Sequence, residues 1–388
     1  MKYLDLLSKH GSKRAAARAI GVDESTIRRR IEKEMKENPS QAAPKRDNLT
    51  ALALEKQLER ESKEKEKLSQ ELNKLLNLKD SVVPVPEWGI RKSLSTSSLL
   101  PVLFCSDMHC GEVIRPEDVD GLNQYNVEIF RERYQTLIDK TIDLSFNHTG
   151  AKSMPGIIYL RGGDAISGDI HLELIADNEL SAIPAIRECF AQEREGIRKL
   201  AEAFGNVHVI SVPGNHDRVT QKPTHSNYFH TSLGTMLAWW LESSFVDDKR
   251  ISFHTPASGD AYFQAAGWNV LMNHGDRMGS KGGMGFVGPA ATIARGHWKL
   301  YDNWTRTGRP VDIILTGHLH TSLKLERGYA NGSLAGFSPF ARDMRAIPSP
   351  PTQWLLFFNR DICVADAKEI VLGSFPRRKA PLSPEWSW

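Results

Sequence analysis

Five predicted β-strands of this 388-residue chain each run directly into a short polar segment with histidine, aspartate or asparagine. These segments are residues 106–109, 162–164, 214–217, 273–276 and 317–320. A single such residue after a strand is usually a turn or capping residue. The carboxyl ends of strands in open α/β sheets, however, are where sites assemble. Five segments together, beside glycines that permit tight turns, therefore predict one shared site.

Short β-rich segments alternate with helical stretches from Leu99 onward, which predicts an α/β domain over residues 99–373. Strands are expected at 100–105, 156–161, 207–212, 251–254, 268–273, 311–316 and 353–358. Helices are expected at 127–146, 180–204 and 229–243. An irregular tail is expected over residues 374–388.

The polar segments offer more metal ligands than a single cation with an open coordination position can use. The candidate ligands among them are four histidines, two aspartates and one asparagine: Asp107, His109, Asp164, Asn215, His274, His318 and His320. This number suits two cations that share a bridging carboxylate. Two cations roughly 3.5 to 4 Å apart clamp a phosphoryl group and acidify a bridging water, so the pattern predicts phosphate ester hydrolysis.

The ordered motifs DxH, GD, GNHD, a further histidine and GHxH resemble those of the calcineurin-like metallophosphoesterase superfamily, from Leu99 to Phe358. The resemblance implies a four-layered fold in which two packed β-sheets are flanked by helices. It also implies two ligand sets bridged by Asp164: Asp107, His109 and His320 for the first metal, and Asn215, His274 and His318 for the second. The family often uses Mn²⁺, while imidazole with carboxylate also suits Fe or Zn²⁺.

The resemblance further implies roles for two residues that follow Asn215. His216 matches a catalytic imidazole that stabilises the phosphoryl group or protonates the leaving oxygen, which typically contributes about 10²- to 10⁴-fold. Asp217 is expected to fix the tautomer of that ring by accepting its other N–H. Arg277 and Lys281, in a glycine-rich loop, are candidate contacts to substrate phosphate, although a solvated surface loop is the alternative.

The spelling of two motifs bears on the branch of the superfamily. The second motif lacks the arginine of GDxxDRG, and the third reads GNHD instead of GNHE. Both departures point away from Ser/Thr protein phosphatases and toward phosphodiesterases and nucleases. The segment 331–333, after the last histidine motif, is interpreted as a structural turn.

The first 33 residues predict three short helices, with Ser12 and Asp23 as caps of the second and third. Ala17, Gly21 and Ile27 occupy the small, left-handed and core positions of a helix-turn-helix, so this unit resembles that DNA-binding family. Its third helix is expected to present side chains to base edges and phosphates: Ser25, Thr26, Arg28, Arg29 and Arg30. A helical hairpin that binds protein, or binds nothing, is the alternative.

Residues 34–98 are expected to form a helical spacer followed by a flexible linker. Leucines at 4-3 spacing would allow a homodimer through this spacer, but Glu61 and Lys65 interrupt the seam, so a single solvated helix is the alternative. Residues 1–80 hold 19 Lys and Arg against 14 Asp and Glu. This basic excess suits a polyanionic partner, and solvated surface charge is the alternative.

Composition limits where the protein works. No run of 18 apolar residues is present, which excludes a membrane-spanning protein. The first thirty positions show no export signal, so a cytoplasmic location is expected. That location would be the host cytoplasm if the chain is encoded by a bacteriophage, whose metallophosphoesterases it resembles. The four cysteines lack CxxC spacing and are expected to be free thiols.

The favoured hypothesis is a binuclear metal-dependent phosphoesterase that hydrolyses phosphodiester bonds, as a DNA-directed nuclease or phosphodiesterase. The alternative is a phosphomonoesterase or nucleotide hydrolase whose helical N-terminus binds protein. A DNA-binding regulator with an inactive phosphoesterase shell is disfavoured, because burying unused imidazoles and carboxylates is costly.

Overall fold

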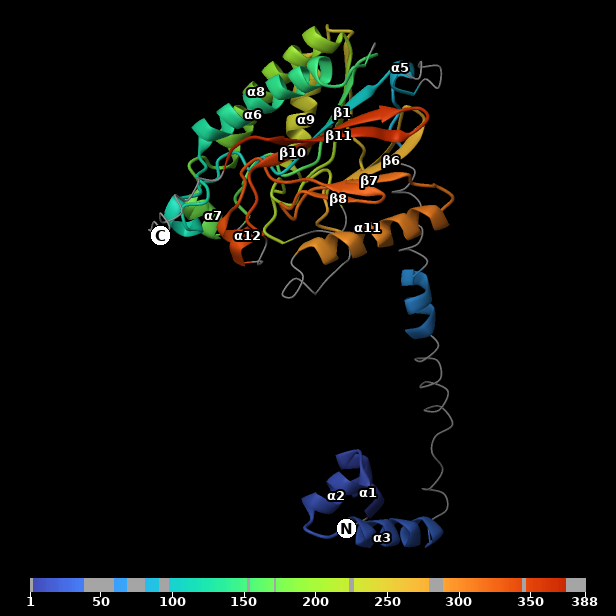
Figure 1. Ribbon diagram of the computed structural model, residues 1–388. Helices are drawn as coiled ribbons and strands as arrows, with labels where there is room; N and C mark the ends of the chain where they lie inside the picture. The colour runs from blue at the N-terminus through green and yellow to red at the C-terminus, as the bar shows by residue number, and fades with distance from the viewer. Residues whose placement is uncertain are drawn as a thin grey trace, which may run out of the picture. The chain divides into compact units, whose positions relative to one another are not determined.

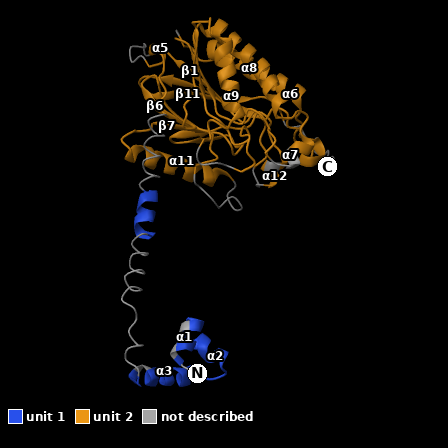
Figure 2. Ribbon diagram, turned by 180° about the vertical axis from the view of Figure 1, so that it is seen from behind, with its two compact units in different colours: residues 1–75 blue, residues 76–388 orange. Residues whose placement is uncertain are grey.

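A computed structural model of the chain describes residues 3–37, 59–67, 81–90, 98–151, 154–170, 172–222, 227–278, 289–343 and 347–374. The chain divides into two compact units, Met1–Leu75 and Leu76–Trp388 (Figure 2). Within the described ranges, no helix combines the length and the apolar composition that crossing a bilayer requires. All four cysteines are free thiols, as predicted.

Within residues 3–37 of the first unit, the structure has helices α1 (Tyr3–His10), α2 (Lys13–Ala19) and α3 (Glu24–Glu37). Both predicted caps are confirmed: Ser12 Oγ accepts the Ala15 N–H at 3.1 Å, and Asp23 Oδ1 accepts the Thr26 N–H at 3.1 Å. Helix α3 runs beyond the predicted end at residue 33, because the first helix breaker in the sequence is the Asn38-Pro39 pair.

The core of this unit confirms the three positions singled out in the sequence. Ala17 and Ile27 are buried, and Gly21 adopts a left-handed conformation with φ of 72°. Leu6 and Ile31 complete a small apolar cluster among the three helices. In the predicted spacer, residues 59–67 are helical. The leucines of its predicted seam lie outside the described residues, so homodimer formation stays a prediction.

The second unit begins earlier than predicted, because residues 81–90 are not a free linker. The Val83 N–H donates to Tyr262 O at 2.8 Å, and the Tyr262 N–H donates to Ser81 O at 2.7 Å. Val83 is buried between the sheets, and α5 (Glu87–Ile90) follows. The prolines at 84 and 86 therefore lie in a segment that packs onto the domain.

Two mixed sheets form the centre of this unit (Figure 1). The first sheet has the order β11-β10-β1-β2-β3-β4, with β1 to β4 parallel. Its strands are β1 (Leu100–Cys105), β2 (Ile157–Arg161), β3 (Val207–Ser211), β4 (Ile251–His254), β10 (Thr352–Asn359) and β11 (Cys363–Val371). The second sheet has the order β5-β6-β7-β9-β8. Its strands are β5 (Asp260–Ala265), β6 (Trp268–Asn273), β7 (Ile313–Thr316), β8 (Leu323–Leu325) and β9 (Gly328–Ala330).

Helices cover the outer face of each sheet, which confirms the predicted four-layer fold. Helices α6 (Val127–Asn147), α8 (Ala182–Phe204) and α9 (Leu233–Ser244) cover the first sheet, and α11 (Pro289–Arg306) covers the second (Figure 1). Between the sheets, buried side chains such as Phe104 and Phe263 form a continuous apolar core. This core fixes how the strand ends of one sheet face those of the other.

Candidate metal centre

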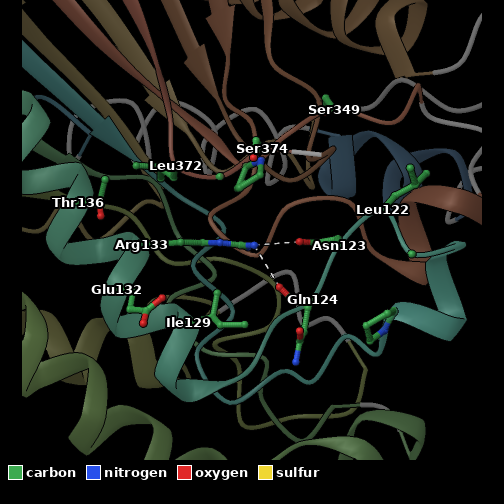
Figure 3. Close-up of a pocket in the computed structure, with 14 residues that line it drawn as sticks. Leu122, Asn123, Gln124, Ile129, Glu132, Arg133, Thr136, Ser349, Leu372 and Ser374 are labelled. Carbon is green, nitrogen blue, oxygen red and sulfur yellow. Dashed lines mark hydrogen bonds between the residues drawn. The ribbon is translucent and has the colours of Figure 1, made fainter. Parts of the chain in front are cut away.

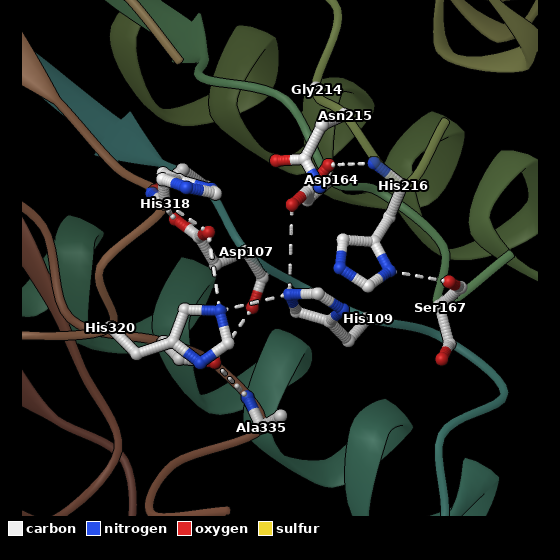
Figure 4. A network of polar contacts seen from close by, with 12 residues as sticks. Asp107, His109, Asp164, Ser167, Gly214, Asn215, His216, His318, His320 and Ala335 are labelled. Atoms are coloured by element: carbon white, nitrogen blue, oxygen red, sulfur yellow. Dashed lines mark hydrogen bonds and ion pairs between the residues drawn. The ribbon is translucent and has the colours of Figure 1, made fainter. Parts of the chain in front are cut away.

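The five polar segments of the sequence lie together where strands of both sheets end. Figure 4 shows Asp107, Asp164, Asn215 and His320 from four of them. In the first sheet, Asp107 and His109 follow β1, Asp164 follows β2, and Asn215 follows β3. In the second sheet, His274 follows β6, and His318 and His320 follow β7. The predicted ligands thus come from two sheets and meet at one place.

Asp107, His109 and His320 form the first cluster, in which the potential ligand atoms all lie within 4.8 Å of one another. The two imidazole Nε2 atoms are 3.0 Å apart, and His320 Nε2 is 3.4 Å from Asp107 Oδ1. Asp107 and His109 are buried. Two buried imidazole nitrogens that face each other beside a carboxylate are arranged to share one cation.

Asp164, His274 and His318 form the second cluster, again with potential ligand atoms within 4.8 Å of one another. His274 Nε2 lies 2.9 Å from Asp164 Oδ2 and 3.1 Å from Asn215 Oδ1. Asp164 Oδ2 is also 3.9 Å from His109 Nε2 in the first cluster. Asp164 therefore lies between the two clusters, where a bridging carboxylate would be needed.

Five of these residues adopt a left-handed backbone that non-glycine residues rarely use: Asp107, His109, Asp164, His318 and His320. Such conformations cost roughly 1–3 kcal/mol each and persist only where the surrounding structure enforces them. Glycines make room for the carboxylates, since an added Cβ at Gly214 would overlap Asp164 Oδ1 and one at Gly317 would overlap Asp107 Oδ2.

The pKa shifts of Asp164, His109 and His318 suit metal binding. Against the effect of burial, however, Asp164 raises the pKa of His274 and Asp107 raises that of His320. Burial acts to raise the pKa of Asp164, but His274 and His216 outweigh it and hold that pKa well below its usual range. Burial and the neighbouring His216 lower the pKa of His109 well below its usual value. Burial and His274 lower the pKa of His318 to about 4. Ionised carboxylate and neutral imidazole are the forms that bind metal ions, so Asp164, His109 and His318 fit divalent cations directly, and cation binding would release protons from His274 and His320.

The calcineurin-like phosphoesterase family model matches residues 100–322. The chain belongs to this family. A comparison with curated proteins gave no significant match. Family membership and the two clusters together indicate a metal-dependent phosphoesterase, a hydrolase acting on phosphate esters with a pair of divalent metal ions.

Asp217 accepts backbone N–H groups, whereas the sequence predicts that it accepts a ring N–H of His216. Asp217 Oδ2 accepts the N–H groups of Asp164 and Gly214, both at 2.9 Å, and its Oδ1 accepts the Ala165 N–H at 2.9 Å. The His216 ring instead has its Nδ1 2.7 Å from the carbonyl oxygen of Ser167 (Figure 4). Because Asp217 is buried beneath the loop after β2, it shapes the backbone that carries Asp164.

His216 lies beside both clusters of the phosphoesterase. Its backbone N–H donates to Asp164 Oδ1 at 2.7 Å, and its ring centroid is 4.8 Å from that of His109. Glu112, which the sequence analysis missed, has its Oε2 3.7 Å from His109 Nδ1. The spacing of three residues after the DxH histidine was the available signal, since ligating imidazoles usually have an acceptor at their second nitrogen.

Arg277, one of the two residues predicted to contact substrate phosphate, lies beside the second cluster. The Arg277 guanidinium lies 3.5 Å from the centre of the Tyr228 ring, and its Nε is 3.7 Å from Asp276 Oδ2. Asp276 follows His274 by two residues, so Arg277 is held next to the second cluster. Lys281 lies outside the described residues.

The predicted DNA contacts on α3 fall into two groups. The hydroxyls of Ser25 and Thr26 donate to the Asp23 carboxylate at 2.5 and 2.7 Å, so they reinforce the helix cap. Arg30 packs on the ring of Tyr3 and hydrogen-bonds its hydroxyl. The remaining predicted contacts, Arg28 and Arg29, are exposed. Arg28 Nε lies 3.4 Å from a solvated Glu32 carboxylate, a pairing that is weak at a surface.

A separate pocket of about 550 Å³ lies between α6 and the segment that follows β11 (Figure 3). Arg133 forms part of its wall and is almost fully buried. Its Nη2 donates to Asn123 Oδ1 at 2.9 Å and its Nη1 donates to Leu334 O at 3.0 Å. Because this guanidinium is occupied by internal acceptors, the pocket is a poor candidate for binding anions.

Proposed function

We propose that this phosphoesterase hydrolyses phosphodiester bonds and that its physiological substrate is DNA. The reaction class rests on the position of Asp164, whose Oδ2 is 2.9 Å from His274 Nε2 and 3.9 Å from His109 Nε2. When bound, two divalent ions would polarise the phosphoryl group and lower the pKa of water in the centre. We propose Mn²⁺ as the ion, while Fe or Zn²⁺ also suits imidazole and carboxylate.

The proposed ligand sets follow the two clusters. Asp107, His109 and His320 would hold a first metal, Asn215, His274 and His318 would hold a second, and Asp164 would contribute to both. Asp107, His109, Asp164 and His274 are buried, so these proposed ligands are held by the surrounding structure before any ion binds.

His216 is the proposed acid for the leaving oxygen. Its Nδ1 lies 2.7 Å from Ser167 O, and a carbonyl oxygen only accepts, so that nitrogen carries a proton. Nε2 is then the ring nitrogen that would give a proton to the leaving oxygen. The ring lies beside His109, close to where the phosphoryl group would be held. Such an acid typically contributes about 10²- to 10⁴-fold.

A diester substrate is supported by the charge around the first cluster. Glu112 lies 3.7 Å from His109 and its side chain is 15% exposed. Burial raises the pKa of Glu112, against the opposing effect of His320 and His216, and in its ionised form the carboxylate disfavours the dianion of a phosphomonoester more than the monoanion of a phosphodiester. Arg277, held beside the second cluster, is the proposed cation for the substrate backbone.

DNA as the substrate is supported by the three-helix unit. Its buried Ala17 and Ile27 and its left-handed Gly21 match the helix-turn-helix spacing. Since Ser25, Thr26 and Arg30 make internal contacts, we propose Arg28 and Arg29 as the principal contacts to DNA phosphates and bases.

The test compares the full chain with Arg28→Ala/Arg29→Ala in Mn²⁺, on labelled duplex DNA, a bis-aryl phosphodiester and an aryl phosphomonoester. We expect the wild type to prefer the diester. The double variant should lose DNA cleavage at physiological salt and retain small-ester hydrolysis. In a plot of the logarithm of the DNA cleavage rate against the logarithm of the salt concentration, its slope should be less steep than that of the wild type by roughly 2. Lys63→Ala/Lys65→Ala, which removes the same charge from another exposed helix, is the matched control.

Two outcomes would contradict the proposal in different parts. Faster hydrolysis of the monoester would show that the enzyme is a phosphomonoesterase. Unchanged DNA cleavage and salt dependence in the arginine variant would show that α3 does not deliver DNA, which would favour a protein partner for the helical unit.

A further inference from the structure

The carbonyl group of Asp107 is held by the segment that begins at residues 331–333, which the sequence predicts to be a structural turn. Asp107 has a left-handed backbone, with φ of 52°. Its carbonyl oxygen accepts the Ser333 hydroxyl at 3.0 Å and the Leu334 N–H at 3.1 Å. The Ser333 hydroxyl oxygen in turn accepts the Ala335 N–H at 3.1 Å, which orients the hydroxyl toward Asp107.

The residue before Asp107 is held by the side-chain amide of Gln353. Gln353 Oε1 accepts the Ser106 N–H at 2.8 Å, and its Nε2 donates to Ser106 O at 3.2 Å. The Ser106 hydroxyl donates to Asp107 Oδ2 at 2.5 Å. The backbone and the carboxylate of the first ligand are therefore both fixed by neutral polar groups.

Asn331 joins this arrangement to the second sheet. Its Nδ2 is 2.6 Å from Gln353 Oε1 and 3.0 Å from the carbonyl oxygen of Phe104, at the end of β1. Its backbone N–H donates to the carbonyl oxygen of Thr316, at the end of β7, at 2.7 Å. Asn331 thus contacts the strand that leads to Asp107 and the strand that leads to His318 and His320.

The first cluster depends on this connection because its residues come from both sheets. Asp107 and His109 follow β1, whereas His320 follows β7. Asn331, Ser333 and Gln353 are 1%, 2% and 0% exposed, so they do not contact substrate. We propose that these three residues are positioning residues that hold the first metal's ligands from the two sheets in register. The proposal rests on Asp107, His109 and His320 binding one metal.

Arg133 supports the same segment from the side of the pocket. Its Nη1 donates to Leu334 O at 3.0 Å and to Ala335 O at 2.8 Å (Figure 3 shows its other contacts). The backbone that carries Ser333 is therefore fixed on both sides, which is what a positioning role requires.

The test is a calorimetric titration of the metal-free full chain with Mn²⁺. Ser333→Ala should weaken one of the two binding steps by about 10- to 100-fold and leave the other unchanged, the range typical for groups that support metal ligands. Ser333→Thr, which keeps the hydroxyl, should restore the affinity. Ser338→Ala is the matched control, because this buried serine instead caps α12 (Pro339–Asp343) through the Ala341 N–H.

Single-site backgrounds identify which step changes. In His318→Ala only the first metal should bind, and adding Ser333→Ala should weaken it. In His320→Ala only the second metal should bind, and adding Ser333→Ala should have no effect. If Ser333→Ala does not fold, Gln353→Glu provides the same comparison, since it keeps the acceptor for Ser106 and loses the Nε2 donor.

Three results would overturn the proposal. Unchanged affinities in Ser333→Ala would show that Asp107 needs no such support. Equal weakening of both steps, with a matching fall in Tm, would show a general structural role. A wild type that binds fewer than two Mn²⁺ would remove the metal assignment itself, and that failure is distinct because it appears before any substitution is made.

Discussion

The two sheets of the phosphoesterase domain contribute different chemistry to the metal centre. The first sheet supplies all the oxygen ligands proposed here and one imidazole: Asp107, His109, Asp164 and Asn215. The second supplies only imidazoles: His274, His318 and His320. Each cluster takes residues from both sheets, so neither sheet forms a cluster alone. The centre is therefore a property of how the sheets pack, and the apolar core between them is part of its construction.

Charge in the centre originates in the first sheet. Burial acts to lower the pKa of His274 and His320, but Asp164 raises that of His274 and Asp107 raises that of His320. The backbone of the second sheet responds to the same charge, since the His318 N–H donates to Asp107 Oδ1 at 2.9 Å. Changes to the carboxylates should therefore affect both sheets, whereas loss of one imidazole should affect one cluster.

The largest effect is expected from Asp164→Asn. Because this carboxylate lies between the clusters, its neutralisation should release both metals and lower turnover to background. His320→Ala should lose only the first metal, and His318→Ala only the second. Metal content per chain and turnover, measured on the same samples, check this difference between the sheets.

Asp169→Asn is the matched control for Asp164→Asn. Asp169 lies in the same loop, but its Oδ2 accepts the Ala182 N–H at 3.2 Å, at the start of α8. The Asp169→Asn variant should retain both metals and near-normal turnover. Two ions per chain in Asp164→Asn would mean that the sheets hold their metals independently, and the bridging assignment would be wrong.

A smaller effect is expected from His216→Gln. This substitution changes a side chain that follows a strand of the first sheet, but it removes no proposed metal ligand. Turnover should fall by about 10²- to 10⁴-fold while metal content stays unchanged. The loss should shrink for esters with acidic leaving groups, because these need no proton from the enzyme. Turnover across a series of aryl esters measures this, with the exposed His148→Gln as control. An equal loss for every leaving group would argue against His216 as the acid.

The sequence indicated the proposed ligands better than the residues that support them. Strands β1, β4 and β6 have their predicted bounds, and strand-end histidines and aspartates carry a chemical signal of their own. Edge strand β11 escaped prediction because Asp366, Lys368 and Glu369 interrupt its apolar pattern, and β8 and β9 are only three residues long. No helix was predicted over α11, although its Trp304 packs against the second sheet.

The supports were missed because they depend on tertiary contacts. Asp217 directly follows His216, yet its carboxylate turns to the loop after β2. Ser333 lies 226 residues from the Asp107 carbonyl that it contacts. Neither spacing nor composition records such a pairing, since any buried serine or aspartate satisfies the local pattern equally well.

The smallest expected effect is on the pH dependence of the free energy of unfolding. It arises from two buried histidines, one in each half of the domain. Burial lowers the pKa of His208, in β3, to about 4, and it lowers the pKa of His297, on α11, to about 4. Both folded values lie below the unfolded value of about 6.5. The unfolded chain therefore binds more protons, and stability should fall as pH drops from 6.5 toward 4, by at most roughly 3 kcal/mol per imidazole.

Substitution of each histidine by glutamine separates the two halves. His208→Gln and His297→Gln should each remove part of the pH dependence of Tm in the metal-free protein, measured by thermal unfolding between pH 7.5 and 5. Because one apolar core joins the sheets, both variants should flatten the pH dependence of the same single transition. Two transitions, each altered by only one variant, would show that the sheets unfold separately and that the metals, rather than the core, hold the two halves of the centre together.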